Sequence, residues 1–337
     1  MNGSLVSVIM PVHNSEKYLR ESLLSILTQT YENIEVIIVN DGCTDGSMKI
    51  VDSFNDQRIR IIQNNENIGL AASLNKAIQS SQGIYLARMD ADDISYSRRI
   101  EKQILFLDNN LDVDIVGSAM RFIGHSRYVS RFPQSHEECR VQLLFNVCFG
   151  HPTVVFRKSV FADPRNLYDE SLKQYSEEYE LWCRLVSQFR FHNLNEVLLY
   201  YRIHGPQHKA ETEMLRRRNS LVIQNRYLTL TLGQLTASEL AIHARMSMMQ
   251  EVNTTDDLGE CNALLLRMVA LNTQWRSFDE KKLANLLALR FFEFCYHNSA
   301  VGLASITYYY KSDWLRFYNP SLKLKASHLL KTLLKKL

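Results

Sequence analysis

The sequence lacks several features that would mark a specialised class of protein. Among 337 residues it has only 12 glycines, 6 prolines and 6 cysteines, with no C-x-x-C pair. No apolar stretch approaches the roughly 20 residues that are needed to cross a bilayer. These absences exclude a collagen-like or disordered chain and argue against a disulfide scaffold or a zinc site. The scattered cysteines predict buried, reduced thiols.

The N-terminus and the net charge argue against two further classes of protein, secreted proteins and nucleic-acid binders. The N-terminus runs into an apolar segment without a basic leader region, so no signal peptide is visible and we expect a cytoplasmic protein. A net charge of +3, from 39 basic and 36 acidic residues, argues against a nucleic-acid binder. This charge is uneven, because the stretch from Trp314 to Leu337 holds six basic residues and no acidic one.

The first two hundred residues alternate short apolar runs with amphipathic segments. This pattern is typical of an α/β fold with a mostly parallel sheet flanked by helices. Strands are expected near residues 5–10, 34–39, 58–63 and 85–89, and further strands near 115–122, 153–156 and 197–201. Helices are expected over about 15–29, 45–54 and 70–80.

The composition changes after Pro206. The next proline is Pro320, glycine becomes sparse, and Leu, Ala, Met, Arg and Gln dominate. These features predict a C-terminal helical module. We therefore expect an α/β domain over 1–210, a helical module over 211–318 and a tail helix over 319–337.

The tail combines helical apolar spacing with basic residues. Its apolar side chains follow the i, i+3, i+4, i+7 pattern of one helix face, at Ala326, Leu329, Leu330, Leu333, Leu334 and Leu337. Lysines lie outside that stripe. Such a helix suits an anionic membrane surface, at about 1 kcal/mol per basic residue. The alternative is a helix that docks on its own domain or on a second subunit of a homo-oligomer.

Four polar clusters follow predicted strands, at residues 11–14, 40–42, 64–69 and 90–93. Ligands of open α/β sheets gather at the carboxyl ends of the strands. Asp41 can accept a hydrogen bond from a base or ribose, and the aspartates of 90–93 offer oxygen ligands for a divalent cation on a phosphate group. Each cluster alone is also compatible with a turn or a helix cap. The four in this order favour nucleotide binding.

Several longer stretches carry a family resemblance. They read V-S-V-I-M-P-V-H-N, Q-T-Y-E-N-I-E-V-I-I-V-N-D-G-C-T-D-G-S, N-E-N-I-G-L-A-A-S-L-N-K-A-I, G-I-Y-L-A-R-M-D-A-D-D, H-P-T-V-V-F-R-K, Y-S-E-E-Y-E-L-W-C-R-L and Y-R-I-H-G-P-Q-H. Over residues 4–208 the chain resembles the nucleotide-sugar glycosyltransferases of family 2. The resemblance implies the GT-A fold, a Rossmann-like arrangement.

The resemblance also implies roles for matching residues. Those implied to bind the nucleotide-sugar donor are Pro11, His13, Asn14, Glu16, Asp41, Asn67, Lys76, Arg88, Asp90 and Ala91. Those implied to hold Mn²⁺ or Mg²⁺ are Asp92, Asp90 and His204. Glu178 matches the catalytic base. The family usually has Asp there, so Glu177 is the alternative base.

The implied reaction is an inverting, metal-dependent transfer from UDP-GlcNAc, UDP-Gal or UDP-Glc to a hydroxyl of a saccharide acceptor. The acceptor is expected to be lipid-linked, in lipopolysaccharide or capsule biosynthesis at the inner face of the cell membrane. Such a transfer needs a base opposite the leaving group and positive charge beside the leaving diphosphate. A catalytically impaired scaffold that binds nucleotide sugars is the second hypothesis. A nucleotidyltransferase is the third, although the chain lacks the basic, glycine-rich loop expected of one.

Two further residues have open interpretations. Trp182, four residues after Glu178, falls on the same helix face if a helix starts there, so it can stack on a sugar or belong to the core. His151 can border the acceptor or simply form part of a turn.

Overall fold

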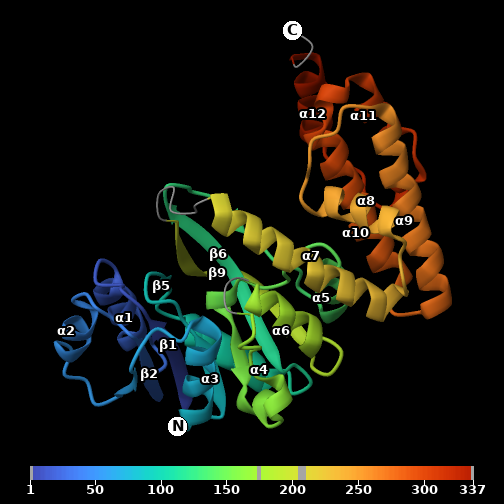
Figure 1. Cartoon of the computed structure of the whole chain (residues 1–337). Coiled ribbons are helices and arrows are strands. Elements are labelled where there is room, and N and C mark those ends of the chain that lie inside the picture. Colours follow the sequence, from blue (N-terminus) through green and yellow to red (C-terminus); the bar gives the residue numbers. More distant parts are fainter. Residues whose placement is uncertain (1–2, 173–175, 204–209, 335–337) are drawn as a thin grey trace. The chain divides into compact units, whose positions relative to one another are not determined.

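The computed structural model describes residues 3–172, 176–203 and 210–334 (Figure 1). The chain divides into two compact units, one of residues 1–139 with 147–220 and one of residues 140–146 with 221–337. The boundary that the sequence places at 210/211 falls inside helix α7 (Ala210–Leu232), and residues 319–337 belong to the second unit.

The first unit is built on one sheet in the order β3-β2-β1-β4-β8-β6-β9-β5, with β7 paired to β6. Strands β1 to β4 run parallel, β8 runs antiparallel to β4 and β6, and β6 and β9 are parallel. The strands are β1 (Val6–Val12), β2 (Ile34–Asp41), β3 (Ile59–Asn64), β4 (Tyr85–Arg88), β5 (Ile94–Ser95), β6 (Ile115–Gly124), β7 (Val129–Ser130), β8 (Val155–Arg157) and β9 (Phe191–Ile203). The predicted α/β fold with a mostly parallel sheet is confirmed.

Helices cover both faces of this sheet. Alternate β1 residues, such as Val8 and Met10, join one buried cluster with leucines and isoleucines of α1 and α4, while α3 packs on β1 and β2 through the opposite face. The helices are α1 (Leu19–Leu27), α2 (Ser47–Asp52), α3 (Leu70–Ser80), α4 (Arg99–Asn109), α5 (His136–Gln142) and α6 (Glu177–Leu185). Short 3₁₀ turns are η1 (His151–Thr153), η2 (Lys158–Phe161) and η3 (Pro164–Asn166).

Strand β1 runs past residue 10, where the sequence predicts its end, and includes Pro11. Its pairing with β4 stops at Ile9, opposite Arg88, whereas its pairing with β2 continues to Val12. Pro11 is tolerated because one side of β1 is already open there, as at a sheet edge. The carboxyl ends of β1 and β4 therefore separate, and the strand order changes direction between them, which is where such sheets bind ligands.

The second unit is helical, as the sequence predicts. It contains the second half of α7, then α8 (Ala237–Ser247), α9 (Thr255–Trp275), α10 (Glu280–His297), η4 (Ser299–Val301), α11 (Leu303–Tyr310), η5 (Asp313–Arg316) and α12 (Leu322–Leu334). Thr236 and Thr254 form capping boxes that begin α8 and α9. Within the described ranges, no helix has both the length and the apolar composition to cross a bilayer.

Candidate functional site

A pocket of about 340 Å³ lies at the carboxyl ends of β1 and β2. It brings together segments that are far apart in sequence. Its lining consists of Pro11, Val12, His13, Asp41, Asn67, Gly69, Leu70, Ala71, Leu172 and Glu177. Four of the residues that the sequence assigns to donor binding thus share one cavity, and a glutamate of α6 joins them.

Asp41 organises the floor of this pocket. Its carboxylate accepts hydrogen bonds from the backbone N–H groups of Ile68 and Gly69 at 2.8 and 3.1 Å, and from the Asn64 amide at 3.0 Å. Only 4% of the residue is exposed. Asp41 therefore fixes the β3–α3 turn against the end of β2.

Gly42 allows this close approach. Its φ is +68°, and a Cβ atom there would lie 2.7 Å from the backbone nitrogen of Asn67. A side chain would push the β3–α3 turn away from β2 and change the pocket floor.

Three of the predicted donor residues make other contacts and do not line the cavity. The Asn14 amide oxygen accepts from the Thr44 N–H at 2.8 Å, and Glu16 accepts from the Gly46 N–H at 2.6 Å. Lys76 donates to the Asn64 amide oxygen at 2.6 Å. These residues hold the loops around the pocket in place.

The acidic cluster after β4 surrounds a buried arginine. Asp90, Asp92 and Asp93 each place a carboxylate oxygen within 4.8 Å of the other two. The Arg88 guanidinium, on a residue only 2% exposed, pairs with Asp90. Ala91, between these acids, is also buried. The arginine provides a positive charge next to the acids.

Asp93 is a residue of this cluster that the sequence analysis did not single out. One of its carboxylate oxygens accepts from the Arg202 N–H at 2.8 Å, while Oδ2 is buried without a hydrogen-bond partner among the described residues. Burial, together with the charges of Asp90 and Asp92, raises the pKa of Asp93 well above its usual range. An orphaned buried oxygen in a set of three carboxylates fits a divalent cation.

A second titratable cluster lies at the start of α6. His151, Glu177 and Glu178 each have a ligating atom within 4.8 Å of the others. Burial, with the neighbouring Glu178 charge, raises the pKa of Glu177 to about 7, and burial also raises the pKa of Glu178. Burial lowers the pKa of His151 well below its usual value, so its imidazole is neutral. A carboxylate with a raised pKa next to a neutral histidine can act as a general base.

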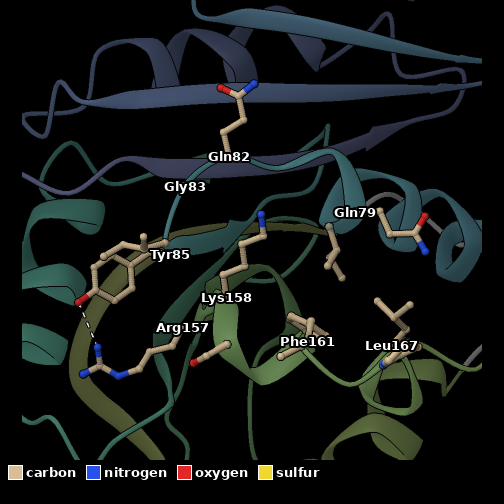
Figure 2. A pocket seen from close by; sticks show the side chains of 13 residues that line it. Gln79, Gln82, Gly83, Tyr85, Arg157, Lys158, Phe161 and Leu167 are labelled. Carbon is tan, nitrogen blue, oxygen red and sulfur yellow. Dashed lines mark hydrogen bonds between the residues drawn. The ribbon is translucent and has the colours of Figure 1, made fainter.

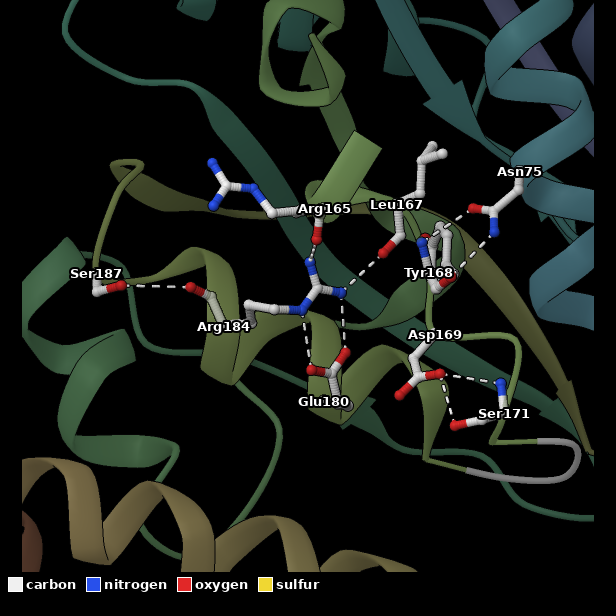
Figure 3. A network of polar contacts seen from close by, with 9 residues as sticks. All are labelled: Asn75, Arg165, Leu167, Tyr168, Asp169, Ser171, Glu180, Arg184 and Ser187. Carbon is white, nitrogen blue, oxygen red and sulfur yellow. Dashed lines mark hydrogen bonds and ion pairs between the residues drawn. The ribbon is translucent and has the colours of Figure 1, made fainter. Parts of the chain in front are cut away.

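Tyr168 connects this cluster to α3. Its hydroxyl lies 2.8 Å from His151 Nε2. Its backbone N–H and C=O both bond the Asn75 amide at 2.9 Å (Figure 3). Asn75 lies on α3, which begins at the pocket lining. The segment around Tyr168 therefore links α3, which begins beside the pocket, to the cluster of His151, Glu177 and Glu178.

The same segment is tied to α6. Arg184 forms a two-pronged ion pair with Glu180 at 2.9 Å and donates to the Leu167 carbonyl at 2.8 Å (Figure 3). At the other end of α6, Ser176 precedes Glu177 with a left-handed φ of 77°, and its hydroxyl lies 3.1 Å from that of Ser220. Both ends of the glutamate-bearing helix are thus anchored.

Two remaining sequence assignments have different outcomes. His204 lies outside the described residues. Trp182 is fully buried and stacks on Phe156, with edge contacts to Phe149 and Phe191, so it belongs to the core and does not stack on a sugar.

Sequence reasoning missed Tyr168, and it counted Asp93 in the acidic cluster of 90–93 without giving it a role of its own. Tyr168 stands in a loop without a motif, and no local signal identifies it. The third acid of D-A-D-D offers a signal for Asp93, because it lies within the expected metal cluster.

A larger cavity, of about 720 Å³, lies beside the amino-terminal end of β4 (Figure 2). It is lined by residues at the beginning of β4 and the end of the antiparallel β8, including Tyr85, Arg157 and Lys158. Arg157 donates to the Tyr85 hydroxyl at 3.2 Å. Because ligands of such sheets bind at the carboxyl ends of the parallel strands, the smaller pocket is the better candidate.

Known proteins share this architecture. The structure of residues 1–349 of S. aureus TarS in complex with UDP-GlcNAc aligns with a TM-score of 0.56 and 18% identity, covering 91% of this chain and 92% of that TarS fragment. A mannosyltransferase from Pyrobaculum calidifontis, solved with GDP-Man and Mn²⁺, aligns with a TM-score of 0.53 and 16% identity, covering 98% and 88%. At these identities the likeness shows the GT-A fold alone.

Sequence comparison gives the family. The family model described as "Glycosyl transferase family 2" matches residues 7–163. The O-antigen biosynthesis glycosyltransferase WbnJ of Escherichia coli is 36% identical over 211 residues, which are 60% of this chain and 80% of WbnJ. The pocket and the acidic clusters lie within this matched region or close to it. The chain belongs to the glycosyltransferases of family 2.

Proposed function

We propose that this glycosyltransferase transfers a sugar from a UDP-sugar to a hydroxyl of a saccharide acceptor with inversion at the anomeric carbon. UDP-GlcNAc, UDP-Gal and UDP-Glc are the candidate donors. The observation that carries the proposal is that one cavity is lined both by Asp41 and Asn67, on the nucleotide side, and by Glu177 of the α6 cluster.

The donor would lie along the carboxyl ends of β1, β2 and β4. His13, whose Nδ1 lies 2.7 Å from the Asp41 carbonyl oxygen, and Asn67 would bound the base and ribose. Asp90 and Asp92, with Asp93, would hold Mn²⁺ or Mg²⁺, and His204 is a further proposed ligand. Such a cation would stabilise the negative charge of the departing diphosphate. The complex of the Pyrobaculum mannosyltransferase with Mn²⁺ supports this cofactor.

Glu178 is our proposed base. Glu177 lines the donor pocket, and the next residue on a helix points about 100° away. Glu178 can therefore face an acceptor while staying in the same cluster. Glu178 would take the proton of the acceptor hydroxyl as the hydroxyl oxygen forms a bond to the anomeric carbon. The bond between the anomeric carbon and the diphosphate oxygen would break, and its electrons would leave with UDP.

The acceptor is proposed to be a lipid-linked saccharide used in surface glycan assembly. The relationship to WbnJ, which is named for O-antigen biosynthesis, supports this class.

The test is Glu178→Gln, assayed by UDP release with Mn²⁺ across the candidate donors and a panel of saccharide acceptors. We expect turnover to fall roughly 100- to 10,000-fold, the usual contribution of a general base, while calorimetric UDP binding stays unchanged. Glu32→Gln, at an exposed position before β2, is the matched control and should keep full activity. Unchanged turnover of Glu178→Gln would remove the base assignment. A wild-type chain that binds UDP but releases none from any donor would favour the scaffold.

A further inference from the structure

Helix α12 turns its apolar side away from the rest of the helical unit. His328 and Thr332 are at most 1% exposed, whereas Leu330 is 58% exposed. The other exposed leucines of α12 are Leu322 at 83%, Leu324 at 38%, Leu329 at 47%, Leu333 at 50% and Leu334 at 59%. The helix therefore docks on its own unit through its polar side. We call the row formed by Leu322, Leu329, Leu330 and Leu333 the leucine face.

Polar contacts fix this rotation of the helix. His328 Nε2 lies 3.3 Å from the Ser305 hydroxyl, and Ser327 lies 2.8 Å from the Tyr296 hydroxyl. Lys331 donates to the Tyr296 carbonyl at 3.2 Å and lies over its ring. Turning the leucine face inward would break these bonds and expose the aromatic surface that packs around His328.

Charge identifies the partner. At about 100° per residue, Lys323 and Lys325 lie on the two sides of the leucine face. Between Trp314 and Leu337 the sequence has six basic residues and no acidic one. An anionic lipid leaflet has apolar acyl chains beneath negatively charged headgroups. A row of leucines between lysines is complementary to such a surface. A contiguous apolar row on a protein surface usually marks an interaction site.

We propose that the leucine face docks on an anionic membrane, with the leucines in the boundary between headgroups and acyl chains and the lysines among the headgroups. The attachment is peripheral and uses a surface that is already formed. It does not depend on the proposed donor or acceptor, because it can be measured without either.

The experiment is co-sedimentation of the full chain with vesicles of phosphatidylglycerol and phosphatidylcholine, compared with phosphatidylcholine alone. The test variant is L329Q/L330Q/L333Q. The matched control is V222Q/L230Q/L266Q, three similarly exposed apolar residues of the same unit at 63%, 68% and 52%. Circular dichroism checks that both variants stay folded, and light scattering without lipid gives the oligomeric state.

We expect wild type and control to sediment with anionic vesicles, and the test variant to bind at least about tenfold more weakly. K323E/K325E should weaken anionic binding by roughly fivefold or more per lysine and leave neutral binding unchanged. The proposal is overturned if wild type stays in the supernatant, or if the test variant binds like wild type. It is equally overturned if the test variant only converts a dimer to a monomer, since the face would then bind a second copy.

Discussion

The two units of the chain depart from the usual distribution of side chains in opposite directions. In the sheet unit, charged residues are buried: Arg88, Asp93 and Arg99 are at most 2% exposed. In the helical unit, a row of leucines is exposed on α12. Burying charge and exposing leucines both cost free energy unless a partner compensates. Each departure therefore supports one of the two proposals, a charged donor with its cation in the first unit and an anionic lipid surface in the second.

The largest expected effect concerns the buried charges. Asp92→Asn should lower turnover roughly 100- to 1,000-fold, because it removes one of the three carboxylates proposed to hold the cation. Chelation with EDTA should abolish the wild-type activity, and added Mn²⁺ should restore it. Asp112→Asn, at an exposed acid 66% accessible, is the control. Full activity in EDTA would contradict the cation site and would mean that the acids only neutralise the buried Arg88 guanidinium.

Leucines of the helical unit should divide into two classes. Leu287→Ala, at a fully buried position of α10, should lower the free energy of unfolding by about 2–5 kcal/mol. Leu330→Ala on α12 should change it by less than about 0.5 kcal/mol. Urea unfolding measures both. An equally large loss for Leu330→Ala would show that the leucine face is covered in solution.

Glu177 should make stability depend on pH. Its pKa in the folded chain is about 7, above its ordinary value, so the folded state loses stability as the pH rises from about 4.5 through 7. Glu177→Gln should therefore raise the free energy of unfolding by about 1–3 kcal/mol at pH 8 and have little effect at pH 4. Unfolding curves at the two pH values test this. A difference of equal size at both would contradict the titration.

Tyr168 offers the smallest and most selective effect. Tyr168→Phe removes the hydroxyl that bonds His151 and should lower kcat about tenfold, with the KM for the donor unchanged. Tyr96→Phe, at an exposed tyrosine, is the control. Should Tyr168→Phe lower thermal stability but leave kcat intact, the residue would support the fold without positioning the glutamate cluster.

Much of the fold was predictable because its signals are local. The apolar runs at β1, β2 and β4 and the spacing in α3 lie within single elements, and the structure has strands and a helix there. Helix α1 begins only at Leu19, not near residue 15, because Ser15–Tyr18 form a turn. Helices α4 and α5 lay outside the predicted set.

The site was predictable only in part. Pro11, His13, Asp41 and Asn67 line one cavity, whereas Asn14, Glu16 and Lys76 support its loops. A motif indicates that a residue belongs to a region, but whether its side chain points into the pocket depends on the turn that carries it. The link from Tyr168 to His151 and to Asn75, 93 residues away, has no local signature at all.

The sequence by itself determined the family, the alternation of strands and helices, and the apolar stripe of the tail, because each depends on neighbouring residues. Only the tertiary structure decided which side of α12 is buried. The period of a helix shows that two faces differ, but the surface beneath it selects which one docks, and here His328 and Thr332 fit that surface. Tertiary structure likewise brought His151 to the two glutamates of α6 and left Trp182 in the core.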